Sequence, residues 1–223
     1  MNNTILNIYK PVGITSFDVV RIIRRATGIK KVGHGGTLDP FAEGVLLIMT
    51  GNKTKKMQEI LMYNKVYEAI LKLGQSTETG DPTGRIIGRC DIPEIEVNLL
   101  EEVQKKFTGK ILQEPPIYSA KKINGIPAYK YARRGEKIKL ETKEVNILDL
   151  SLRKISHDKI SIYVECGSGT YIRKLGEDIA RELGTCGYLV NLKRLRVGPY
   201  KIEDSIKIDR FLKLIEVDTK KRV

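Results

Sequence analysis

One stretch, residues 33–46, constrains this chain more than any other, and it reads Gly-His-Gly-Gly-Thr-Leu-Asp-Pro-Phe-Ala-Glu-Gly-Val-Leu. Its glycines permit backbone conformations that other residues resist, and they let another molecule approach the main chain closely. Pro40 biases Asp39 toward an extended conformation, so we expect this carboxylate to lie on a loop. The apolar run at residues 45–49 is typical of a buried strand. The pattern therefore predicts a carboxylate held between a glycine-rich loop and a rigid element, where reactive groups are often placed.

An ordinary turn is the alternative interpretation of this stretch, because Gly, Asn, Asp and Pro build most turns. A nucleotide-binding loop is excluded. The chain has no G-x-x-x-x-G-K-[ST], since Asn52 and not glycine precedes Lys53 and Thr54, and it has no G-x-G-x-x-G.

The charge balance points to a polyanionic partner. The 223 residues carry a formal net charge of +13, which favours nucleic acid or an anionic membrane surface over an evenly solvated basic surface. Residues 115–139 hold seven Lys or Arg and a single acid, Glu136. Residues 187–202 hold no acid and four basic residues: Lys193, Arg194, Arg196 and Lys201. This clustering indicates a binding surface.

The cysteines and apolar segments indicate the class of protein. Cys90, Cys166 and Cys186 are far apart and form no C-x-x-C pair, so their spacing favours neither a zinc site nor a disulfide framework. We expect reduced thiols in a cytoplasmic protein. The sequence has neither a secretory apolar region nor a run of transmembrane length.

Apolar periodicity predicts an α+β chain. Strands are expected at residues 5–9, 45–49, 66–73, 144–153, 159–166 and 188–200. Helices are expected from Ser16 as N-cap to Gly28, at 53–62, at 98–108, from Thr170 as N-cap to Gly184, and at 205–214. Residues 74–89 are expected to form a polar turn cluster, with no further role deduced for Asp81.

Several motifs, in this order along the chain, resemble those of the TruB family of tRNA pseudouridine synthases. Residues 33–46 resemble the family's catalytic motif G-H-x-G-[TA]-L-D-P-x-A-x-G-x-L. The other resemblances are K-P-x-G-x-T-S at 10–16, G-x-x-T-K at 51–55, T-x-T-x-D-x-x-G at 77–84, P-P-x-Y-S-A-x-K-x-x-G at 115–125, Y-x-Y-A-R-x-G at 129–135 and S-x-G-T-Y-I-R at 167–173. Together they span most of the chain, which makes the resemblance far more specific than one glycine-rich loop.

The resemblance implies a fold and a domain organisation. The fold is the pseudouridine synthase fold, a mixed and largely antiparallel bent sheet flanked by helices and loops. The whole chain, 1–223, would be one catalytic domain with an RNA-clamping insertion at about 115–140. We expect no C-terminal PUA-like domain, which bacterial relatives usually carry.

The resemblance also assigns the site. Asp39 matches the catalytic aspartate, and Arg173 matches the arginine that pairs with it. Substrate-binding residues are implied at His34, Tyr67, Tyr171 and Leu192. The RNA clamp would use Tyr118, Lys121, Lys122, Lys130, Arg133 and Arg134.

The implied activity is isomerisation of uridine to pseudouridine at position 55 in the T-loop of tRNA, with the base flipped out of the stack. This chemistry has no redox or phosphate step, so we expect neither a cofactor nor a metal. The expected partner is the T-arm of tRNA, bound by a monomer without an obligate protein partner.

Three other functions fit parts of the pattern. A non-catalytic RNA-binding or RNA-folding module would share the fold and the basic clamp, although it would tend to have lost Asp39 or Arg173. An aspartate-dependent hydrolase or nuclease needs several converging carboxylates, and only Asp39 and Glu43 share the loop. A dyskerin-type synthase guided by RNA requires a PUA domain and protein partners.

Overall fold

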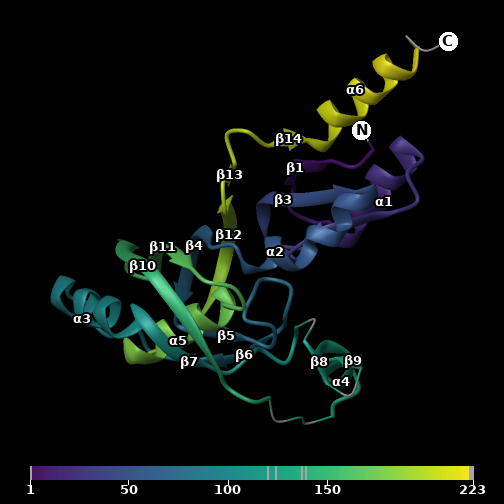
Figure 1. Cartoon of the computed structure of the whole chain (residues 1–223). Helices are drawn as coiled ribbons and strands as arrows, with labels where there is room; N and C mark the ends of the chain where they lie inside the picture. Colours follow the sequence, from purple (N-terminus) through teal and green to yellow (C-terminus); the bar gives the residue numbers. More distant parts are fainter. Residues whose placement is uncertain (1, 120, 124, 137, 139, 221–223) are drawn as a thin grey trace. The chain divides into compact units, whose positions relative to one another are not determined.

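The computed structural model describes residues 2–119, 121–123, 125–136, 138 and 140–220 (Figure 1). For residues 133 and 218–220 it describes the backbone alone. The chain divides into two compact units: the first comprises Met1–Tyr67 and Leu192–Val223, and the second comprises Glu68–Asn191. Strands β4 (Lys65–Leu73) and β12 (Gly187–Val197) each run through a boundary between the units. One catalytic domain over 1–223 stays a prediction.

The first unit is built around β3 (Glu43–Thr50). The other strands that lie wholly in this unit are β1 (Ile5–Lys10), β2 (Val32–Gly35), β13 (Tyr200–Lys201) and β14 (Ile206–Lys207). The order is β14-β1-β3-β12, with β2 added to β3 and β13 to β12. The sheet is mixed: β1 and β2 run antiparallel to β3, whereas β12 runs parallel to it and β14 parallel to β1.

Helices cover both faces of β3. They are α1 (Ser16–Thr27), the 3-10 helix η1 (Gly51–Lys56), α2 (Met57–Met62) and α6 (Ile208–Lys220). Leu46 and Ile48 pack with α1 and with Phe211 of α6, whereas alternate residues of β3 pack with Ile60 of α2. The continuous apolar run at 45–49 therefore forms the strand expected from the sequence, and it is apolar throughout because both of its faces are buried.

The N-terminus of α1 differs from the prediction. Thr15, and not Ser16, is the N-cap, because the Thr15 side chain accepts from the Asp18 N–H and the Asp18 carboxylate accepts from the Thr15 N–H. Ser16 is the first helical residue and its hydroxyl is used elsewhere. Gly28 ends the helix with φ 68°, as expected.

The helix expected at 53–62 is divided. Its first turns form η1, and the α-helix begins only at Met57. Ile60 is buried, whereas Met57 is exposed.

The second unit contains the order β4-β11-β10-β7. Its strands are β5 (Gln75–Thr77), β6 (Ile86–Arg89), β7 (Gly109–Gln113), β8 (Lys122–Ile123), β9 (Ile126–Pro127), β10 (Lys143–Ser156) and β11 (Lys159–Cys166). Strand β10 is antiparallel to both β7 and β11, so the strands expected at 144–153 and 159–166 form a hairpin. Pairs β5–β6 and β8–β9 are separate antiparallel ribbons, so residues 74–89 form a hairpin and not only a turn cluster.

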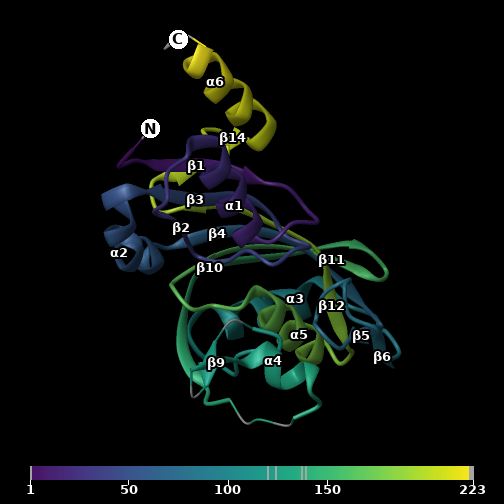
Figure 2. The same ribbon diagram turned by 90° about the vertical axis from the view of Figure 1, so that its right-hand side faces the viewer.

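The helices of the second unit are α3 (Val97–Phe107), α4 (Ala128–Arg133) and α5 (Ile172–Glu182). Helices α3 and α5 lie side by side (Figure 2) and are joined by Lys106 Nζ and Glu182 Oε1 at 2.6 Å. The N-cap of α5 is Tyr171, and not Thr170 as expected. The Thr170 hydroxyl instead donates to the Gly167 carbonyl, within the preceding turn.

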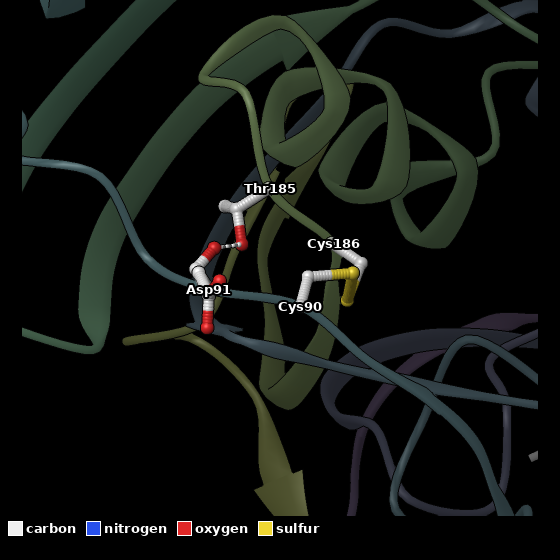
Figure 3. Close-up of a disulfide and its surroundings, with 4 residues drawn as sticks. All are labelled: Cys90, Asp91, Thr185 and Cys186. Carbon is white, nitrogen blue, oxygen red and sulfur yellow. Dashed lines mark hydrogen bonds between the residues drawn. A yellow bond between two sulfur atoms is a disulfide. The ribbon is translucent and has the colours of Figure 1, made fainter.

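The cysteine prediction was wrong. Cys90 and Cys186 form a disulfide with a Cα–Cα distance of 5.8 Å (Figure 3). Cys166 is buried and lies outside this disulfide. Beside the bond, the Thr185 hydroxyl donates to the Asp91 carbonyl at 2.7 Å. The two cysteines are 96 residues apart, so only the tertiary fold brings them together and their spacing carried no sign of the pair.

Candidate active site

Asp39 lies in the connection between β2 and β3, on a loop, as the sequence predicts. Its carbonyl accepts from the Ala42 N–H at 3.1 Å, which closes a tight turn through Pro40. The Pro40 carbonyl in turn accepts from the Gly13 N–H at 2.8 Å. The backbone on the C-terminal side of Asp39 is therefore tied both to itself and to the segment before α1.

Ser16 fixes the residue on the N-terminal side of Asp39. Its hydroxyl donates to the Leu38 carbonyl at 3.0 Å and accepts from the Leu38 N–H at 2.8 Å. Ser16 is 2% exposed and Leu38 is 3% exposed. Two buried backbone groups next to Asp39 thus depend on one side chain, which also explains why Ser16 does not cap its own helix.

Lys10 is a fully buried cation at the same loop. Its ammonium donates to the carbonyls of Ala42 at 2.6 Å and Pro11 at 2.9 Å. Burial lowers the pKa of Lys10 to about 8, and the negative charge of Asp39 opposes that shift. The carboxylate and the ammonium therefore interact electrostatically across the turn.

His34 lies on β2, ahead of the loop. Burial, and then the positive charge of Arg194, lower the pKa of His34, so the imidazole is neutral at pH 7. Within the described part of the chain, its Nδ1 has no hydrogen-bond partner. A neutral ring with an unused buried nitrogen agrees with the predicted substrate contact, which stays a prediction.

Two more predicted substrate-binding residues lie in strands of the first unit. Tyr67 is on β4 and 7% exposed, and Leu192 is on β12 and 4% exposed. Their burial agrees with either of two roles, lining an apolar base pocket or filling a core.

Arg173 and Tyr171 belong to the second unit. Arg173 is 5% exposed on α5, and its guanidinium donates to the carbonyls of Thr79 at 2.6 Å and Tyr118 at 2.8 Å. Its Nε lies 3.8 Å from an Asp81 carboxylate oxygen. The backbone of Tyr171 is held at both N–H and C=O by the side chain of Gln113. The arginine that the sequence assigned to Asp39 is therefore held by three groups of its own unit.

Asp81 was not assigned a role from the sequence. It is 5% exposed, and one of its oxygens accepts from the Thr79 hydroxyl and from the N–H and hydroxyl of Thr83. This turn presents the Thr79 carbonyl to Arg173. The two threonines that flank Asp81 at a spacing of two residues were a sign of such a turn.

The predicted site residues are thus divided between the units. Asp39, His34, Tyr67 and Leu192 lie in the first, and Tyr171 and Arg173 in the second. The pairing of Asp39 with Arg173 stays a prediction.

The predicted RNA clamp contains β8, β9 and α4, which cluster together (Figures 1 and 2). The Tyr118 hydroxyl donates to Glu78 at 2.7 Å, and the Lys121 ammonium donates to the Glu141 carbonyl at 3.3 Å. Lys122, Lys130 and Arg134 are exposed, and Arg134 Nη1 lies 3.4 Å from Glu136 Oε1. The side chain of Arg133 lies outside the described residues.

The second basic cluster needs a correction. Arg194, expected on a basic surface, is 1% exposed. Its guanidinium donates to backbone carbonyls of the first unit, so its charge is used inside the fold.

No metal site stands out in the part of the chain that the structure describes: no group of three or more His, Cys, Asp or Glu residues lies together there. Over the same residues, no helix is long and apolar enough to cross a membrane.

Comparison with known proteins decides the family. Residues 24–172 match the model of the N-terminal domain of the TruB family pseudouridylate synthases. The chain belongs to this family. Residues 173–222 match the model described as the tRNA pseudouridylate synthase B C-terminal domain.

Curated relatives agree with the TruB assignment. The chain is 44% identical over 208 residues to tRNA pseudouridine synthase B of Francisella philomiragia subsp. philomiragia, which covers 93% of this chain and 69% of the relative. It is 42% identical over 207 residues to the protein of the same name from Clostridium tetani, covering 93% and 72%. The predicted enzyme class, a pseudouridine-forming isomerase, is confirmed.

The fold prediction is also confirmed. A solved Cbf5–Nop10–Gar1 complex contains a chain similar to this one, with a TM-score of 0.76 and 26% identity. The match covers 98% of this chain but only 56% of that one. The mixed and largely antiparallel α+β arrangement that the TruB motifs implied is therefore the arrangement observed.

Proposed function

We propose that this chain isomerises uridine to pseudouridine at position 55 in the T-loop of tRNA. The reaction breaks the bond between N1 and C1′, turns the uracil, and joins C5 to C1′, so a C5 proton must leave. It requires an anion at the reacting centre, a group that takes the proton, and a pocket that excludes water. The observation that supports this proposal most strongly is the fixed loop that carries Asp39, within the motif shared with the TruB family.

Asp39 is the anion that acts at C1′ or C6. Arg173 is its proposed partner, because a guanidinium is charged at any relevant pH and matches a carboxylate in geometry. The contacts of Arg173 with Thr79, Tyr118 and Asp81 support this role. An arginine held at three points loses little freedom when it pairs with a carboxylate.

The remaining site residues bind the flipped base. Tyr67 stacks on the uracil and accepts or relays the C5 proton, and Tyr171 and Leu192 line the pocket. His34 is neutral because of burial, and it contacts the flipped nucleotide without acid–base work. Extrusion of the base costs about a few kcal/mol, which contacts between the T-arm and the clamp offset.

The clamp residues bind the tRNA backbone. Lys122, Lys130 and Arg134 present exposed charges, while the tyrosines of the segment offer faces for stacking. We further propose that the chain acts in the cytoplasm as a monomer, without an obligate protein partner, cofactor or metal.

Tritium release tests this function directly. The substrate is an unmodified tRNA transcript labelled at C5 of uridine, and the control is a transcript in which the T-loop uridine is replaced by cytidine. We expect release from the first transcript only. Binding without release from either transcript would favour a non-catalytic RNA-binding module, an alternative that the family membership does not favour.

The role of Asp39 is tested with a matched carboxylate. Asp39→Asn should lower turnover at least about 10³-fold, roughly 4 kcal/mol of transition-state stabilisation, and change the tRNA affinity by less than about tenfold. Glu43→Gln is the control, because Glu43 begins β3 and accepts from the Tyr9 hydroxyl at 2.6 Å. Comparable losses in both variants would point to hydrolytic chemistry by two carboxylates, and an active Asp39→Asn protein would refute the mechanism.

A further inference from the structure

Among the described residues, Arg194 has the largest fully buried side chain, and the proposed chemistry does not use it. It lies on β12, more than 150 residues after the loop that carries Asp39. A buried arginine is costly unless its donors are satisfied. The position of its hydrogen-bond acceptors therefore shows what the residue does.

All the hydrogen bonds that the structure shows for Arg194 go to the backbone on the two sides of Asp39. Nη2 donates to the Gly36 carbonyl at 3.1 Å, and Nη1 approaches the Thr37 carbonyl at 3.4 Å. Nε donates to the Val45 carbonyl at 2.7 Å. One planar group thus joins the residues just before Asp39 to the strand that follows it.

The backbone of Arg194 holds the same region. Arg194 pairs with Gly44 where β12 runs parallel to β3. A Cβ atom at Gly44 would lie 2.2 Å from the Arg194 carbonyl oxygen, and Gly44 has φ 108°, so this close approach is open only to glycine. Main chain and side chain of one residue together fix both ends of the loop.

Only an arginine suits these three acceptors. They are spread over the edge of a planar fork whose donors point in fixed directions, whereas a lysine ammonium is a compact point at the end of a flexible stem. Within the described residues, no carboxylate is recorded in an ion pair with Arg194. Its side chain therefore serves backbone geometry and not a salt bridge.

We propose that Arg194 is a positioning residue of the reaction, and that its guanidinium holds residues 36–45 in the one conformation that presents Asp39 to the substrate. The expected loss of turnover rests on the proposed function, whereas the expected loosening of residues 36–45 does not. This role distinguishes Arg194 from the neighbouring basic residues of β12, Lys193 and Arg196, whose side chains are less buried.

The test compares Arg194→Lys and Arg194→Gln with Arg210→Lys, a matched change at an exposed arginine of α6 in the same unit. Single-turnover tritium release is measured with enzyme in excess, and tRNA affinity is measured separately. We expect Arg194→Lys to slow the single turnover at least tenfold and to change Kd by less than threefold. Arg210→Lys should change each by less than twofold.

Amide hydrogen exchange supplies a readout that does not depend on activity. In Arg194→Lys we expect exchange to quicken at Leu38, Asp39 and Ala42, while the amides of Ile8 and Ile23 in the same core keep their protection. Wild-type single-turnover rate and wild-type loop exchange in Arg194→Lys would overturn the proposal. So would a uniform loss of protection, or loss of folding in both variants, because Arg194 would then support the whole unit.

The two proposals fail in different ways. If the wild-type protein releases no tritium from any tRNA transcript, the proposed function fails. The exchange comparison would still decide whether Arg194 fixes the loop.

Discussion

The Asp39 loop and the RNA clamp are both predicted to contact the same substrate, yet they are held very differently. Around Asp39, buried side chains from other parts of the chain bind three backbone carbonyls: Arg194 at Gly36, Ser16 at Leu38 and Lys10 at Ala42. In the clamp, Lys122 and Lys130 are exposed, and the described hydrogen bonds of Tyr118 and Lys121 connect the beginning of the segment to its unit.

This difference in how the two regions are held matches their predicted roles, catalysis for the Asp39 loop and RNA binding for the clamp. A carboxylate that acts at one atom gains from a geometry fixed before the substrate arrives. A surface that binds a phosphate backbone needs charge within reach but little fixed direction, because ion pairs with phosphates tolerate movement. Hydrogen bonds from buried side chains are thus concentrated around the predicted catalytic aspartate, whereas the predicted clamp presents exposed charges.

The largest expected effect concerns Lys10, whose pKa falls from 10.5 to about 8 in the folded chain. Between these pH values the unfolded chain binds more protons than the folded chain, so stability rises with pH. The unfolding free energy of the wild type, relative to Lys10→Met, should therefore rise by about 3 kcal/mol between pH 7 and pH 10.5. Burial and the charge of Arg194 lower this pKa, while Asp39, Glu43 and Asp18 raise it.

Urea unfolding at a series of pH values measures this difference. The same comparison with Lys122→Met, at an exposed lysine of the clamp, should be flat. Burial and the hydrogen bond to Glu43 raise the pKa of Tyr9 to about 12, but this contribution cancels between the wild type and Lys10→Met. Equal slopes for the buried and the exposed lysine would contradict the contrast between the two regions.

Ser16→Ala should have the next largest effect. It leaves the N–H and C=O of Leu38 buried without their partner, which costs about 2 kcal/mol of unfolding free energy. Turnover should fall as well, because Leu38 precedes Asp39. Ser205→Ala is the control, since its half-buried hydroxyl donates to the carbonyl of Ile202. A loss in Ser16→Ala no greater than in this control would count against the loop as the rigid region.

The motifs predicted where the chemistry lies but not how the predicted catalytic loop is held. Asp39 on a loop before a buried strand followed from glycines and a proline at residues 33–44 and from the apolar run at 45–49. The partners of that loop lie up to about 150 residues away, at Arg194. The local sequence pattern indicates which residues are apolar or flexible. The carbonyl that a buried side chain such as Arg194 binds is determined by the tertiary fold.

Three of the errors have the same origin. Ser16 was expected as an N-cap because serine favours that position, but Leu38 competes for its hydroxyl and Thr15 is free to cap. Arg194 was counted with a basic surface, and Cys90 and Cys186 were expected to be reduced, because sequence distance conceals burial and pairing. These three errors concerned polar or sulfur-containing side chains with a distant partner, while the apolar patterns correctly placed the six strands that were expected.

The clamp predicts a smaller effect that depends on salt. Lys122→Ala and Lys130→Ala should each weaken tRNA binding by about 1 kcal/mol near physiological salt and reduce the slope of log K against log[salt] by about 0.7 to 0.9. Single-turnover rates at saturating enzyme should not change. Lys213→Ala, at an exposed lysine of α6, is the control, and an unchanged slope in both clamp variants would argue against phosphate contacts there.

Tyr118→Phe should have the smallest effect and probes the point where the clamp is attached. The hydrogen bond from Tyr118 is the main cause that lowers the pKa of Glu78, and Arg85 contributes less. Without the hydroxyl, this pKa should rise toward its ordinary value of 4.5 but stay below it, because the ion pair with Arg85 remains. NMR titration of the Glu78 carboxyl measures the shift, and amide exchange at Tyr129, which donates to the Ser119 carbonyl, should quicken only slightly. We expect only a slight change because Arg173 also binds the Tyr118 carbonyl, so the segment should tolerate the loss of one exposed hydrogen bond. A large rise in exchange at Tyr129 would mean that the clamp depends on a single hydrogen bond as strongly as the Asp39 loop does.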